Sequence, residues 1–332
     1  MADLLAIQDL EVRLFDRTGV VLAVRDVSLK IGEGEVVALV GESGCGKSVT
    51  ALAVLRLLPT DAQIAGTVNF AGRDLLKLPL KELRAIRGRD IAMVFQEPMT
   101  SLNPSFTIGN QIGEVLRLHK GLRGKQARDR AAELLSLVRI GAPEQRLRSF
   151  PHQLSGGMRQ RAMIAMALAC DPKLLILDEP TTALDVTTQA QILDIVRDLQ
   201  KRLGMSILLI THDLGVVADL ADRVAVMYAG NKVEDAEVHR IFAAPRHPYT
   251  AGLLRALPSR GRRAGDAQQR LTEIPGLVPV LREPLHACAF APRCPRSTDQ
   301  CVKESPELSP CETDHAVACF HPEPLAAAGA AR

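Results

Sequence analysis

The chain has 332 residues, of which 47% are apolar, with a formal net charge of +3, no Trp and two Tyr. This length predicts more than one domain, and the apolar fraction is enough for a sizeable core. The small charge and the few aromatic side chains argue against a nucleic-acid partner. No apolar run approaches the roughly 20 residues of a membrane-spanning helix, and the N-terminus lacks a signal-peptide pattern. We therefore expect a soluble protein on the side of the membrane where it is made, able to dock on a membrane protein.

Hydrophobic patterns in the first 60 residues predict strands, then a glycine-rich turn, then a helix. The run at 36–40 is typical of a buried strand, and residues 48–58 form a predicted helix that Pro59 ends. Further along the chain, the pattern predicts helices at 158–170 and 187–203 and strands at 174–178, 206–210 and 223–228. Helices that alternate with buried strands predict a parallel sheet of the α/β class.

Composition divides the chain into four parts. We expect a main domain at 1–258, with a mainly helical subdomain at about 97–155 that includes a charged helix at 125–138. A basic linker is expected at 259–270 and a Pro- and Cys-rich extension at 271–322. The last residues, 323–332, are expected to be disordered.

Residues 41–48 read GESGCGKS and match the phosphate-loop pattern G-x-x-x-x-G-K-[ST]. The glycines let backbone amides surround phosphate oxygens, Lys47 offers a charge to the β- and γ-phosphates, and Ser48 offers a hydroxyl to Mg²⁺. The alternative is a chance glycine-rich turn, which the flanking strand and helix disfavour. The predicted nucleotide-binding residues are Gly41, Ser43, Gly44, Cys45, Gly46, Lys47, Ser48 and Val49.

Cys45 lies inside this loop, close to the expected helix N-terminus. A helix N-terminus lowers a thiol's pKa. We therefore expect Cys45 to be reactive, its alkylation to block nucleotide binding, and the nucleotide to protect it.

Two carboxylates follow the predicted strand at 174–178, at the end where open α/β sheets place their chemistry. Asp178 is expected to hold the Mg²⁺ shell. Glu179 is expected to polarise the attacking water as a general base. An apolar run followed by Asp-Glu is weak evidence by itself, and its pairing with a phosphate loop makes it specific.

A second glycine-rich helix start lies at 154–158, with the sequence LSGGM. Ser155, Gly156 and Gly157 at a helix N-terminus form an anion-binding pattern. Since one chain needs one phosphate loop, this second terminus is expected to serve the nucleotide of a partner subunit.

Together these motifs resemble the ATP-binding subunits of ABC transporters, in order and spacing, over nearly the whole chain. The segment 154–158 is similar to the family signature, in which Met158 replaces the usual Gln. The resemblance implies a P-loop NTPase fold of the ABC nucleotide-binding type, with an inserted helical subdomain and a small Cys-rich extension. It also implies ATP and Mg²⁺ as ligands, and a dimer that sandwiches each ATP between one subunit's phosphate loop and the other's signature.

The same resemblance assigns four further residues. Gln96, after a predicted strand at 91–95, matches the Q-loop and implies a Mg²⁺ contact; Asp185 matches the D-loop. His212 matches the switch histidine at the γ-phosphate, although a His there could simply neighbour a helix cap. Phe15 is the candidate for adenine stacking, with core packing as the alternative.

Three stretches resemble the oligopeptide, dipeptide and nickel import group of that family, and the "D" subunit type most closely. They are an extended Q-loop at 95–104, RHPYT at 246–250 and FAPRCP at 290–295. The implied partners are a homologous second ATPase, two membrane permeases and an extracytoplasmic solute-binding protein. The implied location is the cytoplasmic face of the cell membrane, as a peripheral subunit.

Cargo remains open between peptides, which the resemblance favours, and nickel, glutathione or another small solute. A non-transport ABC ATPase of DNA repair or translation is a further alternative. It is disfavoured because the chain has one ATPase unit and no heptad insertion.

Five of the seven cysteines lie in the extension. Cys288, Cys294, Cys301 and Cys319 match the family's tail positions, where the resemblance implies a structural [4Fe-4S] cluster; Cys311 is extra. Zinc is an alternative, although its sites usually contain C-x₂₋₄-C pairs that this spacing lacks. A second alternative is that the thiols are reduced and hold no metal. A third alternative is a metal-sensing tail that gates activity.

Overall fold

The computed structural model describes residues 3–96, 101–182, 184–256 and 274–324. Its chain divides into two units, each made from separate segments. The first unit comprises Met1–Leu5, Lys30–Val36 and Asn69–Ile210. The second comprises Ala6–Leu29, Val37–Val68 and Thr211–Arg332.

Three parallel strands form the buried sheet of the first unit. β7 (Leu174–Asp178) lies between β6 (Ile91–Val94) and β8 (Ser206–Thr211), and every residue of β7 and β8 is buried. Strands buried on both faces require continuous apolar sequence, as these have. The register pairs Val94 with Leu177, so the residues that follow β6 and β7 emerge side by side.

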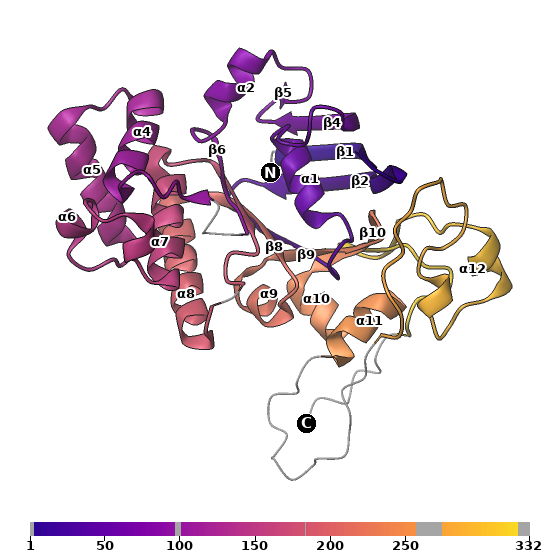
Figure 1. Cartoon of the computed structure of the whole chain (residues 1–332). Helices are drawn as coiled ribbons and strands as arrows, with labels where there is room; N and C mark the ends of the chain where they lie inside the picture. The colour runs from indigo at the N-terminus through magenta and orange to yellow at the C-terminus, as the bar shows by residue number, and fades with distance from the viewer. Residues whose placement is uncertain (1–2, 97–100, 183, 257–273, 325–332) are drawn as a thin grey trace, which may run out of the picture. The chain divides into compact units, whose positions relative to one another are not determined.

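Helices make up most of the rest of the first unit, and α4 to α7 gather into one group (Figure 1). In this group α4 packs against α5 and both contact α7. The long helix α8 has five buried apolar residues along one face, as expected for a helix that covers a core. The elements are α2 (Leu80–Ile86), α4 (Ile108–Lys120), α5 (Gly124–Leu137), α6 (Pro143–Arg146), α7 (Gly156–Ala167) and α8 (Val186–Leu203), with a short strand β5 (Arg73–Asp74).

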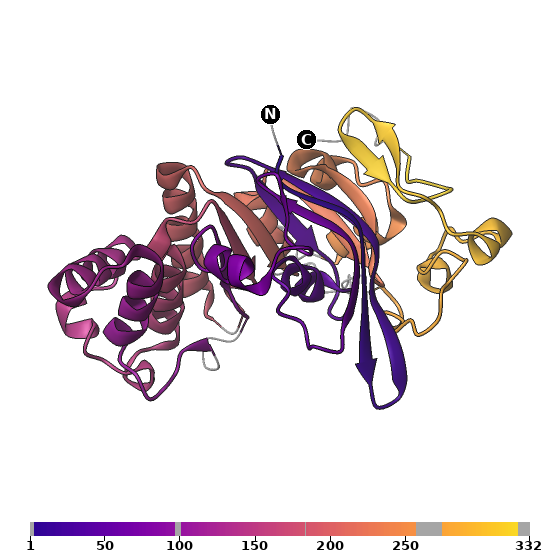
Figure 2. The same ribbon diagram turned by 90° about the horizontal axis from the view of Figure 1, so that it is seen from above.

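The second unit holds the N-terminal strands and a mixed sheet. The long neighbours β1 (Asp3–Asp16) and β2 (Gly19–Gly32) appear in indigo in Figure 2, and β1 also neighbours β4 (Gln63–Phe70). In the mixed sheet β3 (Val36–Val40) pairs in parallel with β9 (Arg223–Tyr228), and β9 pairs antiparallel with β10 (Asn231–Glu237). The helices of the second unit are α1 (Lys47–Val54), α9 (Leu214–Leu220), α10 (Val238–Ala243), α11 (Pro248–Arg255) and α12 (Asp299–Lys303).

The C-terminal extension joins this sheet instead of standing apart from it. β12 (His315–Val317) pairs with β10, and β11 (Ser309–Glu312) pairs with β12. A fully buried carboxylate, Glu234, accepts hydrogen bonds from the His247 amide at 3.0 Å and pairs with His315 Nε2 at 2.7 Å. A buried carboxylate needs such partners, so this group fixes the RHPYT segment and the extension to the same strand.

Most of the predicted elements are confirmed, with small shifts at their ends. The strands at 36–40, 174–178 and 223–228 have the predicted bounds. The helix expected at 48–58 ends at Val54, because Arg56 adopts a left-handed backbone (φ 49°) before Pro59 is reached. The helix expected at 158–170 starts at Gly156, because Ser155 caps it.

Parts of the predicted organisation lie outside the described residues. These are the linker at 259–270, most of the expected tail, and residues 97–100 of the extended Q-loop. Within the part that is described, no helix is both long enough and apolar enough to cross a membrane.

Candidate functional site

The phosphate loop of the second unit follows β3 directly, and two of its glycines are required by close backbone packing. A Cβ on Gly41 (φ 151°) would lie 2.3 Å from the Met227 carbonyl oxygen. A Cβ on Gly46 (φ 101°) would lie 2.4 Å from the Ala23 carbonyl oxygen. Both distances are far below van der Waals contact, and both φ angles favour glycine. The loop is therefore built into the surrounding backbone and is not a chance glycine-rich turn.

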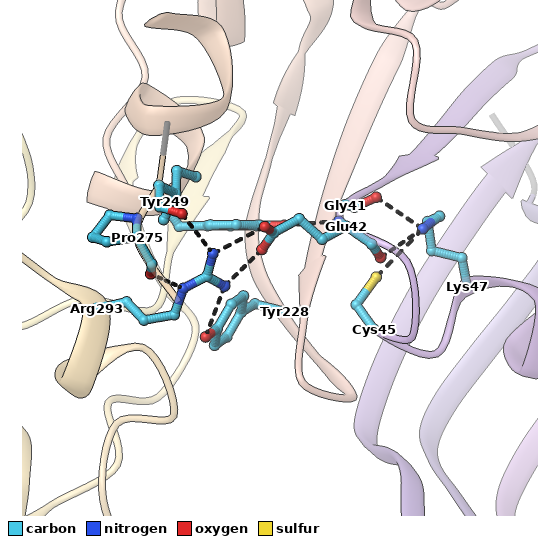
Figure 3. Close-up of polar contacts among 9 residues, drawn as sticks. Gly41, Glu42, Cys45, Lys47, Tyr228, Tyr249, Pro275 and Arg293 are labelled. Carbon is cyan, nitrogen blue, oxygen red and sulfur yellow. Dashed lines mark hydrogen bonds and ion pairs between the residues drawn. The ribbon is translucent and has the colours of Figure 1, made fainter. Parts of the chain in front are cut away.

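Helix α1 begins at Lys47, after Gly46 as a cap residue that offers no side-chain hydrogen bond. The first amides of a helix carry a partial positive charge and favour an anion. Lys47 is 5% exposed, and its Nζ donates to the carbonyl oxygens of Gly41 at 2.8 Å and Glu42 at 3.0 Å (Figure 3). The lysine therefore lies along its own loop, with Ser48 half-buried beside it.

The structure corrects the expectation that Cys45 is a reactive thiol with a lowered pKa. Its side chain is fully buried, and burial raises the pKa of its thiol, against the opposing effect of the Lys47 ammonium. The expected lowering by the helix N-terminus is therefore wrong in direction. A buried, protonated thiol is a poor nucleophile, so Cys45 serves as packing under the loop, where its Sγ would lie 2.8 Å from a Cβ on Gly41.

In the first unit, two predicted residues are brought together at the sheet edge. Gln96 follows β6 and Glu179 follows β7, and Gln96 Nε2 donates to Glu179 Oε2 at 2.9 Å. Thr182 Oγ1 donates to the same oxygen, also at 2.9 Å. Asp178, the last residue of β7, is 5% exposed. The strand end thus presents one buried and one half-buried carboxyl group, the latter held by two side-chain donors.

The backbone at Glu179 is in the left-handed region, with φ at 47°, and its amide donates to the Ile210 carbonyl at 2.8 Å. Such a conformation costs of order 1–3 kcal/mol for a residue with a side chain, and it concentrates at functional sites.

The signature segment and the D-loop contact each other in the first unit. Ser155 caps α7 by accepting the Met158 amide at 3.3 Å. A Cβ on Gly157 would lie 2.5 Å from Thr188 Cγ2, so any larger residue there would have to displace the Thr188 side chain. Asp185 caps α8, and its hydrogen bonds from the side chain and amide of Thr188 lower its pKa. Ser155 and Gly156 remain exposed.

His212 and Phe15 are both exposed, in the second unit. His212 lies between β8 and α9, next to Asp213, which caps α9. Phe15 is 43% exposed near the end of β1, so it is not a core residue. Their roles at the γ-phosphate and at adenine stay predictions.

The four matching cysteines of the extension line one small cavity with Phe290, while Cys311 lies apart on β11. Burial, and then the charges of the other three thiols, raise the pKa of Cys319 to about 11. Among the described residues, no three His, Cys, Asp or Glu side chains are arranged to hold a metal ion. The structure therefore does not support a metal site by itself, although it does gather the predicted four thiols.

The sequence did not predict several residues that form hydrogen bonds to the predicted site residues or to the phosphate loop. Thr182 and Thr188 lie three residues after Glu179 and Asp185, a capping spacing that could have been recognised. Glu42, Tyr249 and Arg293 are far apart in sequence and meet at the phosphate loop; only the fold reveals them.

Comparison with known proteins gives two family matches. Residues 24–182 match the ABC transporter model, and residues 233–301 match the model for the oligopeptide/dipeptide transporter C-terminal region. A probable peptide ABC transporter ATP-binding protein of Sinorhizobium fredii is 53% identical over 96% of this chain and 94% of its own length. The dipeptide transport ATP-binding protein DppD of Bacillus subtilis is 49% identical over 96% and 95%.

Among solved structures, the chain resembles an ATP-binding cassette dimer in a post-hydrolysis state bound to ADP and phosphate. The TM-score is 0.63 at 30% identity, covering 70% of this chain and 98% of that one. The predicted α/β class and the fold of the ABC nucleotide-binding type are thus confirmed, although the sheet predicted as parallel also has the antiparallel pairs β9–β10, β10–β12 and β11–β12.

We expect Cys45 to react slowly with iodoacetamide, because its thiol is buried and its pKa is raised. In the native chain at pH 8, labelling of the Cys45 peptide should be at least about tenfold slower than in the urea-unfolded chain. Mass spectrometry of the digested protein measures both rates. Equal rates would contradict the buried placement.

Proposed function

This chain belongs to the ATP-binding subunits of ABC transporters, and from that premise we propose that it binds ATP with Mg²⁺ and hydrolyses it to power peptide import. The printed names of its relatives, at about 50% identity, concern peptide and dipeptide transport. The observation that carries the hydrolytic role is the Glu179 carboxylate, held by Gln96 and Thr182 at the end of β7.

The phosphate loop supplies the binding half of this function. When ATP binds, the Lys47 ammonium leaves the loop carbonyls that it now contacts and binds the β- and γ-phosphates. The amides of residues 43–49 donate to phosphate oxygens, and the Ser48 hydroxyl is a Mg²⁺ ligand. Phe15 offers an exposed ring for the adenine base.

The acidic strand end supplies the hydrolytic half. Asp178 holds the Mg²⁺ shell, and Gln96 contributes to it. Glu179 accepts a proton from the attacking water, so that the hydroxyl oxygen forms the new bond to the γ-phosphorus as the bond to ADP breaks. His212 contacts the γ-phosphate and thereby reports whether it is present.

A second subunit completes each site. Ser155 and Gly156 are exposed at the start of α7, where they suit the nucleotide of a partner, and Asp185 caps α8, whose Thr188 lies against Gly157. A resembling cassette forms a dimer with ADP and phosphate bound. The proposed complex contains a homologous second ATPase, two membrane permeases and an extracytoplasmic solute-binding protein, with this chain peripheral on the cytoplasmic face.

Oligopeptides or dipeptides are the proposed cargo, because the match to the oligopeptide/dipeptide transporter C-terminal region covers residues 233–301. Nickel, glutathione or another small solute is the alternative, with the same motor role. The permeases and the binding protein select the cargo, so the choice is tested by uptake.

A [4Fe-4S] cluster is the proposed occupant of the cysteine cavity. Cys288, Cys294, Cys301 and Cys319 provide four soft ligands, the number such a cluster requires. Zinc is the alternative, although its sites usually contain C-x₂₋₄-C pairs that this spacing lacks. The cluster would tie together a segment with little core of its own, and no step of transport uses its electrons.

Replacing Glu179 by Gln should leave ATP binding intact and slow hydrolysis at least about 10²-fold, because the general base is lost. Glu144→Gln is the matched control, since Glu144 is an exposed carboxylate paired with Arg128. Phosphate release and ATP affinity are measured on both variants. Normal turnover in Glu179→Gln would remove Glu179 from the proposed role.

Anaerobically purified wild-type protein should contain about four iron and four sulfide per chain. Cys294→Ser should lose most of both, whereas Cys311→Ser should keep them, because Cys311 lies outside the cavity. Chemical analysis and the visible absorption band give the readout. Zinc alone, or no metal under these conditions, would refute the cluster.

A further inference from the structure

A buried guanidinium from the extension reaches the phosphate loop. Arg293 is 9% exposed and stands at the end of a short 3₁₀ turn, Ala291–Arg293. Its NH1 donates to Glu42 Oε2 at 2.7 Å and its NH2 to Glu42 Oε1 at 2.9 Å (Figure 3). Two parallel charge-assisted bonds of this kind are among the stronger contacts in proteins and are specific in geometry.

Arg293 is itself fixed in place. Its Nε donates to the Pro275 carbonyl at 2.7 Å, and NH1 donates to the Tyr228 hydroxyl at 3.3 Å, with the guanidinium 5.7 Å from the centre of that ring. The bonds to Glu42, and then to Tyr228, raise the pKa of Arg293 further. Arg293 therefore remains charged at all accessible pH values, and its side chain cannot easily swing away.

Glu42 is held at three points. Its side chain pairs with Arg293, its amide donates to the Tyr249 hydroxyl at 2.8 Å, and its carbonyl accepts from Lys47 Nζ at 3.0 Å. Lys47 is also the proposed phosphate ligand. A movement of Glu42 would thus displace both the loop backbone and the lysine that depends on it.

The ion pair between Arg293 and Glu42 also has an electrostatic role. Glu42 is the second residue of a loop whose proposed ligand, ATP with its phosphates, is strongly negative. An unpaired carboxylate at this position would repel the phosphates, and Coulomb interactions in a partly buried site are weakly screened. The Arg293 guanidinium neutralises that carboxylate and holds it at the side of the extension.

We propose that Arg293 is a positioning residue of the ATP site, through which the Cys-rich extension sets the affinity of the phosphate loop for ATP. The inference rests on the proposed ATP-binding function and adds to it a residue 251 positions away from Glu42 in the chain. Cys294 of the cysteine cavity directly follows Arg293, so one peptide bond joins the cavity to the residue whose side chain contacts the loop.

The test measures the dissociation constant for Mg-ATP of the purified full chain by titration calorimetry, together with its thermal unfolding midpoint. Arg293→Gln should weaken ATP binding at least about fivefold, the lower end of usual coupling between sites. The dissociation constant of Arg293→Lys should lie between those of Arg293→Gln and wild type, because lysine keeps the charge but cannot make the two parallel hydrogen bonds of arginine. Adding Glu42→Gln to Arg293→Gln should recover part of the affinity by removing the uncompensated carboxylate.

Arg240→Gln is the matched control, since Arg240 on α10 also pairs with a carboxylate of the extension, Glu312 at 3.3 Å, and its ion pairs, with Glu312 and Glu237, involve no residue of the phosphate loop. It should keep the wild-type affinity. Folded Arg293→Gln with wild-type affinity, at whatever melting temperature, would overturn the inference and leave a purely stabilising contact. If Arg293→Gln does not fold, Arg293→Lys decides: weakened binding supports the inference, and unchanged binding overturns it.

Lys47→Ala separates this inference from the function on which it rests. It should bind ATP far more weakly than wild type, whatever the state of Arg293. If wild type binds no ATP, or Lys47→Ala binds as tightly as wild type, the proposed function fails and the inference fails with it.

Discussion

The structure depends on one close approach, that of the loop backbone to its neighbours at Gly41 and Gly46. Any side chain at either position would overlap a carbonyl oxygen, at 2.3 Å for Gly41 and 2.4 Å for Gly46. The loop must therefore curl where β3 ends, so that its backbone amides and the N-terminus of α1 can serve the same anion-binding site. Lys47 lies along this loop, and the side chain of Glu42 pairs with Arg293.

Within each unit, one carboxylate of the predicted site residues or their loop is held by specific donors. Glu42 is neutralised by Arg293, while Glu179 receives hydrogen bonds from Gln96 and Thr182. Donors that fix a carboxylate before a ligand arrives reduce the reorganisation that reaction requires. The left-handed backbone of Glu179 shows that some strain is accepted in return for orientation. In the second unit, the extension joins the sheet through the pairing of β12 with β10, and it reaches the phosphate loop through Arg293.

Local signals explain what the sequence could predict. β3 and β7 are continuous apolar runs, and the order of loop, signature and Asp-Glu pair predicts the candidate site residues without a structure. Long-range packing explains the misses. The burial that raises the pKa of Cys45 arises from tertiary contacts, as do the pairing of β12 with β10 and the meeting of Glu42 with Arg293. The early end of α1 reflects a left-handed Arg56, which no sequence pattern marks.

Uptake tests the central claim, that this ATPase powers peptide import, most directly. Labelled di-, tri- and longer peptides, with nickel and glutathione as rival cargoes, are supplied to cells that carry the wild-type chain or Glu179→Gln together with its partner subunits. The account predicts peptide uptake that requires the wild-type chain and is lost with Glu179→Gln. Peptide uptake that persists with Glu179→Gln would contradict it, and loss of nickel or glutathione uptake instead would assign the same motor to another cargo.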